Sequence, residues 1–333
     1  FRDARRLYVS MVRPIIEFGL TTLPFNAGII DFLENLQLQA LRRIFGFFPH
    51  TKTETLPILC NVTTMRARFV MIKVIFVHKI LSRMSDNFYV KAIILQNWQS
   101  CAGLGSDLRA IAEDYGADLE ECSLFKDLLD AKTSVDHVEF VDSFKDLIRK
   151  LDFSACKSAL KDSADSGGQA SRVFQAIASH SHYCLIKHLE VEMPRYVLPV
   201  YACALSGCDF LTPHNFRNKP SCKFCDASRV GWDHLLFACE GLSESGYRNF
   251  QKFMKCLSWS DSDSLRPKLK KAKRILASLW NRKDFGTLTS FCFAINLKPY
   301  GLAYAPIISR LASTIAQILH TTKHEWEHYV PDT

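Results

Sequence analysis

The chain has 333 residues, of which 48% are apolar and 23% are charged. This composition excludes a disordered protein and leaves room for two or three domains. The most apolar run, residues 69–81, is interrupted by Lys73, His78 and Lys79 and is too short to cross a bilayer, so we expect no membrane partner. No secretory signal opens the chain, so we expect its 12 cysteines to be thiols or metal ligands in the cytoplasm or nucleus.

The net charge of +8 is distributed unevenly. Residues 1–100 carry 13 Lys and Arg against 6 Asp and Glu, whereas residues 101–170 carry 8 against 15. Residues 171–333 are basic again, with 21 against 13. We therefore expect a polyanionic partner to be attracted to the two ends of the chain and repelled by its middle.

Apolar residues recur with helical spacing along most of the chain, and period-two alternation is rare, which predicts a mostly α fold. The first helix covers residues 7–18, where Pro14 predicts a kink or a restart. A second helix covers residues 30–44. Short loops between these helices indicate a bundle.

A long third helix begins after a capping threonine, Thr63 or Thr64, and continues to Leu81. Its spacing predicts an apolar side toward the core and a basic side toward solvent. The expected inward residues are Phe69, Ile72 and Phe76, and the expected outward ones are Arg66, Arg68, Lys73, Lys79 and Arg83.

We divide the chain into three regions. Residues 1–100 form a helical bundle, and residues 101–170 form an acidic helical spacer that ends in a Ser/Gly-rich linker. Residues 171–333 form a helical region that contains a metal-binding module at about 203–242 and a basic helix at 264–281.

The metal-binding module has the spacing C-x2-C-x8-H-x4-C, with Cys222, Cys225, His234 and Cys239 as the fixed points. Three sulfurs and one nitrogen complete a tetrahedral shell for Zn²⁺ and leave no position for a water nucleophile, which favours one structural zinc site. Residues 235–237, Leu-Leu-Phe, would attach the site to a larger core. Chance spacing and a disulfide are the alternatives, and a disulfide requires an oxidising compartment.

Other candidate ligands fit a metal site less well. Cys203, Cys208 and His214 precede the module with looser spacing, and the two cysteines are typical of small apolar core residues. Residues 324–328, His-Glu-Trp-Glu-His, match the H-E-x-x-H signature of zinc metallopeptidases. No third ligand follows His328, so we expect a solvated helix end rather than a catalytic site.

The basic helix at 264–281 combines a buried stripe with a cationic side. Leu269, Ala272, Leu276 and Leu279 recur with the spacing of one buried face. The opposite face is either a solvated surface or a nucleic-acid contact, and it also fits a nuclear import signal. Its cations are Lys268, Lys270, Lys271, Lys273 and Arg274.

Several motifs occur in a recognisable order. The string at 7–19 contains Val-Arg-Pro-Ile-Ile-Glu-Phe-Gly, and 32–46 reads Leu-Glu-x-x-Gln-x-x-Ala-x-Arg-x-Ile-x-Gly after its Phe. Leu-Pro-Ile-Leu at 56–59 and Met-Arg-Ala-Arg at 65–68 follow, and His-Leu-Leu-x-x-Cys appears at 234–239. This order resembles the region after the catalytic palm in reverse transcriptases of non-long-terminal-repeat (LINE-like) retrotransposons.

The resemblance implies a helical thumb and connector, followed by a C-terminal Cys-Cys-His-Cys zinc module that binds RNA or target DNA. The chain contains no Asp-Asp pair, so we expect a fragment without polymerase activity, whose palm precedes Phe1 in the parent chain and is its expected protein partner. The implied contacts to template-primer phosphates are Arg42, Arg43, Arg66, Arg68 and Lys73, with the 266–274 cations holding RNA or DNA.

Two other functions fit the same residues. The zinc site can simply stabilise a helical module that binds proteins, a reading that the acidic middle and the 24 phenylalanines favour. The other alternative is that the chain belongs to a decayed retrotransposon with no present activity.

Overall fold

A computed structural model describes residues 2–47, 53–83, 103–115, 137–165, 221–225, 231–258, 264–293 and 305–328, together with isolated positions. Those positions are 51, 89, 92, 93, 96, 173, 177, 183, 197, 200, 201, 204, 227 and 297. This part of the chain is mostly helical and contains no strand, which confirms the predicted all-α class.

The N-terminal elements are α1 (Arg2–Leu7), the π-helical turn η1 (Tyr8–Val12), α2 (Arg13–Glu17), α3 (Ala27–Phe45), the 3-10 turn η2 (Thr53–Thr55), α4 (Leu56–Cys60) and α5 (Met65–Arg83). The acidic region contributes α7 (Gly103–Tyr115) and α10 (His137–Asp165). The C-terminal elements are η4 (His234–Ala238), η5 (Glu240–Leu242), α13 (Ser243–Cys256), α14 (Arg266–Asn281), α15 (Phe285–Cys292) and α16 (Ala305–His328).

Local signals set the ends of the N-terminal helices. The side chain of Asn26 caps α3 by accepting a 2.9 Å hydrogen bond from the Ile29 N–H. Gly46 ends α3 in the left-handed conformation, with φ +69°, which favours glycine. The hydroxyl of Thr64 caps α5 by accepting from the Ala67 N–H, as predicted. Pro14 occupies the start of α2, so the first helix restarts after the wide turn η1.

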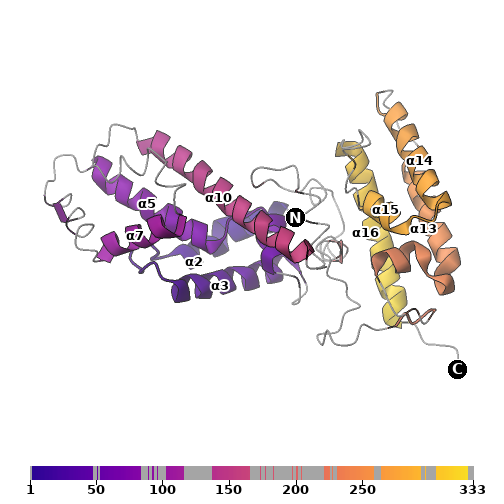
Figure 1. Cartoon of the computed structure of the whole chain (residues 1–333), viewed down its shortest axis with the longest axis horizontal. Helices are drawn as coiled ribbons and strands as arrows, with labels where there is room; N and C mark the ends of the chain where they lie inside the picture. Colours follow the sequence, from indigo (N-terminus) through magenta and orange to yellow (C-terminus); the bar gives the residue numbers. More distant parts are fainter. Residues whose placement is uncertain are drawn as a thin grey trace.

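The acidic helices belong to the N-terminal core. Helices α3, α5, α7 and α10 lie together at one end of the molecule (Figure 1). Leu108 and Ile111 of α7 and Phe140 and Phe144 of α10 are buried in the same cluster as Phe69 of α5. The described part of region 101–170 is therefore packed on the preceding bundle, where we predicted a spacer.

Helices α13–α16 form a second group at the other end (Figure 1). Their buried residues belong to a cluster that also reaches the N-terminal helices, since Tyr8 and Leu41 are part of it along with Leu279 and Leu319. Buried residues therefore connect the two groups. The Ser/Gly-rich segment predicted as a linker begins inside α10, and its residues 166–168 lie outside the described positions.

The predicted faces of α5 are wrong at two positions. Lys73 was expected to be outward, but its side chain is 1% exposed, and Phe76 was expected to be inward but is 37% exposed. Burial of Lys73 is possible because its ammonium pairs with Asp107 and donates to the Leu23 carbonyl. Phe69 is buried and Lys79 is exposed, as predicted, and the Arg83 side chain lies outside the described positions.

None of the described helices combines the length and the apolar character needed to span a membrane.

Candidate metal centre

Two short backbone structures bring the four predicted ligands together. Cys222 and Cys225 lie on a turn closed by a 2.9 Å hydrogen bond from the Cys222 N–H to the Ala227 carbonyl. His234 begins the turn η4, and Cys239 follows its last residue. The Cys239 N–H donates to the His234 carbonyl at 2.7 Å, so η4 fixes the separation of these two ligands.

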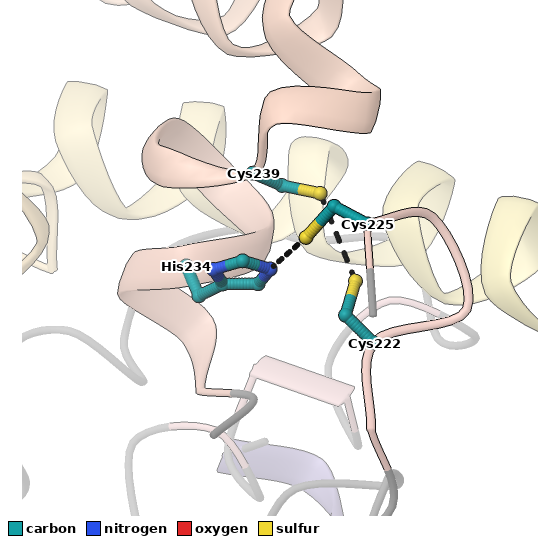
Figure 2. Close-up of side chains that lie close together, drawn as sticks. All are labelled: Cys222, Cys225, His234 and Cys239. Carbon is teal, nitrogen blue, oxygen red and sulfur yellow. Dashed lines mark hydrogen bonds between the residues drawn. The ribbon is translucent and has the colours of Figure 1, made fainter. Parts of the chain in front are cut away.

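The ligand atoms of Cys222, Cys225, His234 and Cys239 all lie within 4.8 Å of one another (Figure 2). The Cys222 and Cys239 sulfurs are 3.7 Å apart, and the Cys225 sulfur is 3.3 Å from Nε2 of His234. Zn–S bonds of about 2.3 Å in a tetrahedron place two sulfurs about 3.8 Å apart. The cluster therefore has the size of a tetrahedral zinc shell, and its cysteines are free thiols rather than a disulfide.

The surroundings of the sulfurs favour a bound cation. Burial acts to raise the pKa of Cys225, but hydrogen bonds from the Ala227 and Glu240 backbone and from neighbouring thiols lower it below its ordinary value. Burial raises the pKa of Cys239 to about 12, and the thiols of Cys225 and Cys222 add to that rise. Three adjacent thiolates repel one another, so a dication that neutralises them fits this donor set.

The Leu-Leu-Phe segment attaches the site to a larger core, as predicted, and also contributes to a small cluster at the site itself. Leu235 packs with the ligands Cys222 and Cys239 in a small buried cluster. Leu236 and Phe237 are buried instead in the large cluster that includes α13–α16. The site is thereby fixed to the C-terminal helices.

Gly241 is a residue that the sequence analysis missed. A Cβ at this position would lie 2.0 Å from the carbonyl oxygen of Phe224. Only glycine lets the η5 turn approach the Cys222–Cys225 turn closely enough to complete the shell. A glycine two residues after the last ligand was the available signal.

The cations predicted on α5 are engaged within the protein. Arg66 forms a two-pronged ion pair with Asp114 of α7, and Arg68 does the same with Glu17 of α2, at 2.6 and 2.9 Å. Lys73 is buried, so its assignment as a phosphate contact is wrong. Acidic residues of the middle region thus neutralise part of the basic N-terminal region.

The two arginines of α3 differ from each other. Arg42 is half-buried and donates to the Thr51 carbonyl at 3.0 Å. Arg43 is exposed one residue further along the helix. Arg43 is therefore the more accessible of the two predicted contacts.

The cations of α14 lie on the surface. The helix contains no acidic residue, and its buried stripe is Leu269, Ala272, Leu276 and Leu279, as predicted. Lys273 is half-buried at the edge of this stripe. The exposed cations are Arg266, Lys268, Lys270, Lys271 and Arg274.

The basic helix and the metal centre share one aromatic cluster. Trp280, near the end of α14, contacts Phe237 of η4 with ring centroids 6.4 Å apart. Trp280 also stacks on Phe250 of α13 at 4.6 Å. The turn η4 is thereby linked by packing to the position of α14.

Of the remaining candidate ligands, His324 has a described side chain, and this side chain is not part of the metal-sized cluster. His324 lies in α16, whereas the side chains of Glu325 and His328 lie outside the described positions. Cys203, Cys208 and His214 also lie outside them. The Cys-Cys-His-Cys set is complete without these residues.

Comparison with known proteins finds no family model, curated protein or solved structure that matches this chain.

Proposed function

We propose that the chain is a nucleic-acid-binding region that follows the palm of a non-long-terminal-repeat retrotransposon reverse transcriptase, with one structural Zn²⁺ in its Cys-Cys-His-Cys centre. The order of sequence motifs supports the family. The compact donor set, with three sulfurs, one nitrogen and backbone N–H donors, supports zinc over harder cations. A closed shell of four protein ligands would stabilise the fold and perform no hydrolysis.

Metal analysis tests the zinc assignment. Protein purified without a histidine tag should contain one zinc per chain, and Cys222→Ser with Cys225→Ser should remove it. His324→Ala should retain the full zinc content, because this residue is not part of the proposed shell. Retention of zinc by the double cysteine variant, or its loss from the His324 variant, would place the metal elsewhere.

The exposed cationic face of α14 carries the nucleic-acid proposal. Lys270, Lys271 and Arg274 project from a helix without acidic residues, whereas Arg66, Arg68 and Lys73 of α5 are held in ion pairs. Cations on such a face neutralise phosphates and release counterions, which gives salt-sensitive binding with little base selectivity. Arg43 would supply a further phosphate contact.

Charge reversal tests this face. We expect labelled RNA to bind the full chain with an affinity that falls steeply between about 50 and 200 mM salt. Lys270→Glu with Arg274→Glu should weaken binding and reduce the salt slope. The matched control is Lys150→Glu with Lys161→Glu on the exposed side of α10, which changes the net charge equally. Equal losses in both variants, or affinity independent of salt, would contradict the proposal.

An exposed apolar face on the first helices favours a protein partner as well. Phe18 is 88% exposed, and Ile15, Met11 and Leu7 continue its stripe along the preceding turns. Phe32 of the adjacent α3 is also exposed. We propose that this surface packs against the palm of the reverse transcriptase, because large apolar patches usually mark protein contacts.

The isolated chain offers a test of this surface. Without a palm, the patch should cause self-association at high concentration. Phe18→Asp with Phe32→Asp should restore a monomer in sedimentation without changing RNA affinity. Salt-insensitive RNA binding, combined with such self-association, would favour the zinc-stabilised protein-interaction module instead.

A further inference from the structure

An exposed tyrosine adjoins the basic helix. Tyr247 of α13 is 54% exposed, and its ring centroid lies 6.3 Å from that of Trp280 in α14. Trp280 is fixed from other sides by Phe250, Phe237 and Phe285, with centroids at 4.6, 6.4 and 5.8 Å. The Tyr247 ring therefore packs against an aromatic cluster that holds Trp280 in place, while about half of the Tyr247 residue remains accessible to solvent.

Cations lie along the same edge of α14 as Trp280. Lys273 precedes Trp280 by seven residues, which is close to two helical turns, so both occupy one ridge about 10 Å apart along the axis. Burial raises the pKa of Cys256 in α13, and the charge of Lys273 opposes that rise, which places Lys273 near α13. Lys270, one turn earlier, is exposed beside this ridge.

We propose that the seam between α13 and α14 binds single-stranded nucleic acid, with an unpaired base on Tyr247 and the adjoining phosphates on Lys273 and Lys270. This inference rests on the proposed nucleic-acid function and specifies its substrate. A cationic ridge alone would accept duplex and single strand alike. An open aromatic ring at its end adds stacking that only an unpaired base can use, because bases in a duplex are stacked on each other.

The seam would contact the phosphate backbone and the flat face of a base rather than the base edges, so it accepts any base. Stacking on an aromatic side chain is available to all four bases and carries little sequence information. The described residues at the seam do not distinguish ribose from deoxyribose. Single-stranded RNA and single-stranded DNA therefore form two arms of one experiment.

Three substitutions of Tyr247 in the zinc-loaded full chain test the inference, with anisotropy of labelled 12-mers as the readout. Tyr247→Leu keeps an apolar contact with Trp280 but removes the aromatic face, and it should weaken single-strand binding about 10-fold. Tyr247→Phe should bind as the natural chain does. Tyr247→Ala also removes the ring but adds no branched side chain, so it checks that weaker binding by Tyr247→Leu does not come from a steric clash of the leucine. Thermal melting of each variant verifies that it is folded.

The duplex arm separates this inference from the proposed function. Duplex of the same sequence should bind more weakly than the single strand, and Tyr247→Leu should leave duplex binding unchanged. Lys270→Glu should weaken both. If the natural chain bound neither the single strand nor the duplex, the proposed function itself would be refuted. Two outcomes would refute only the stacking site. In the first, binding is salt-sensitive but Tyr247→Leu does not alter it. In the second, Tyr247→Leu weakens binding of duplex and single strand equally.

Discussion

Lys73 and Asp107 form an ion pair that connects α5 to α7 inside the N-terminal core, with side chains 1% and 13% exposed. Asp107 also accepts a 2.8 Å hydrogen bond from the Phe25 N–H. Because removal of the carboxylate leaves a buried ammonium without its counter-charge, Asp107→Ala should lower the free energy of unfolding by about 3 kcal/mol. Urea denaturation of the full chain measures this.

The control for Asp107 is Asp114→Ala, which breaks the ion pair with the half-exposed Arg66 on the same two helices. An exposed pair contributes less than about 1 kcal/mol. Lys73→Met combined with Asp107→Ala should recover part of the loss, since no charge remains buried. Similar losses for Asp107→Ala and Asp114→Ala would show that burial does not determine the strength of these pairs.

Glu34 should make stability depend on pH. Burial raises the pKa of its carboxyl to about 7, and nearby Asp152 adds to the rise, although the carboxylate accepts a 2.5 Å hydrogen bond from the Met65 N–H. The folded state thus binds this proton more tightly than the unfolded state, so Glu34 should lower stability as pH rises from about 4.5 to 7.

Glu34→Gln removes this titration and keeps an oxygen that can accept from Met65. Its stability should exceed that of the natural chain above pH 7, by at most about 3 kcal/mol, with the difference shrinking toward pH 5. Urea denaturation of both proteins at several pH values measures this difference in the free energy of unfolding. Glu113→Gln on the exposed side of α7 is the control and should show no such trend. A constant difference across pH would contradict the assignment.

Gly241→Ala should impair the metal centre. The added methyl would lie 2.0 Å from the Phe224 carbonyl oxygen, so the η5 turn must move away from the Cys222–Cys225 turn. We expect zinc affinity to fall by at least 10-fold in competition with a chromogenic chelator. Gly286→Ala is the control, because nothing lies within 4 Å of its added Cβ, and it should leave zinc affinity unchanged.

Metal removal should affect the C-terminal helices selectively. Leu236 and Phe237 connect η4 to α13–α16, whereas α5 belongs to another buried cluster. Chelation of the zinc should therefore speed amide exchange in η4 and in the neighbouring α13 while leaving α5 protected. Uniform loss of protection in α5 as well would mean that the metal centre supports the whole chain.

The sequence predicted features that depend on local spacing. The extents of α14 and of the ligand set follow from residues close together in the chain, and the structure confirms both the helix and a metal-sized cluster. The orientation of Lys73 depends on Asp107, which lies 34 residues away and on another helix. Lys73 lies four residues after Phe69 and shares its face of the helix, but its charge predicted an outward side chain because no residue nearby in the sequence indicates a buried partner.

The packing of the acidic region against α5 could not be predicted from the sequence for the same reason. Charge counts separated residues 101–170 from their neighbours, but they could not show that Asp107 and Asp114 pair with Lys73 and Arg66. Gly241 was missed because its necessity comes from the Phe224 carbonyl, which only the folded turn brings near. Contacts across the chain, rather than residue types, decide these positions.

The pairing of the acidic helices with α5 gives the chain an electrical polarity. Residues 1–100 and 101–170 have opposite formal charges of +7 and −7, so residues 171–333 account for the net +8. A distant polyanion is therefore attracted most strongly to residues 171–333, which include the cations of α14, before any contact forms. This attraction fades beyond about 8 Å at physiological ionic strength, so it should speed association most in dilute salt.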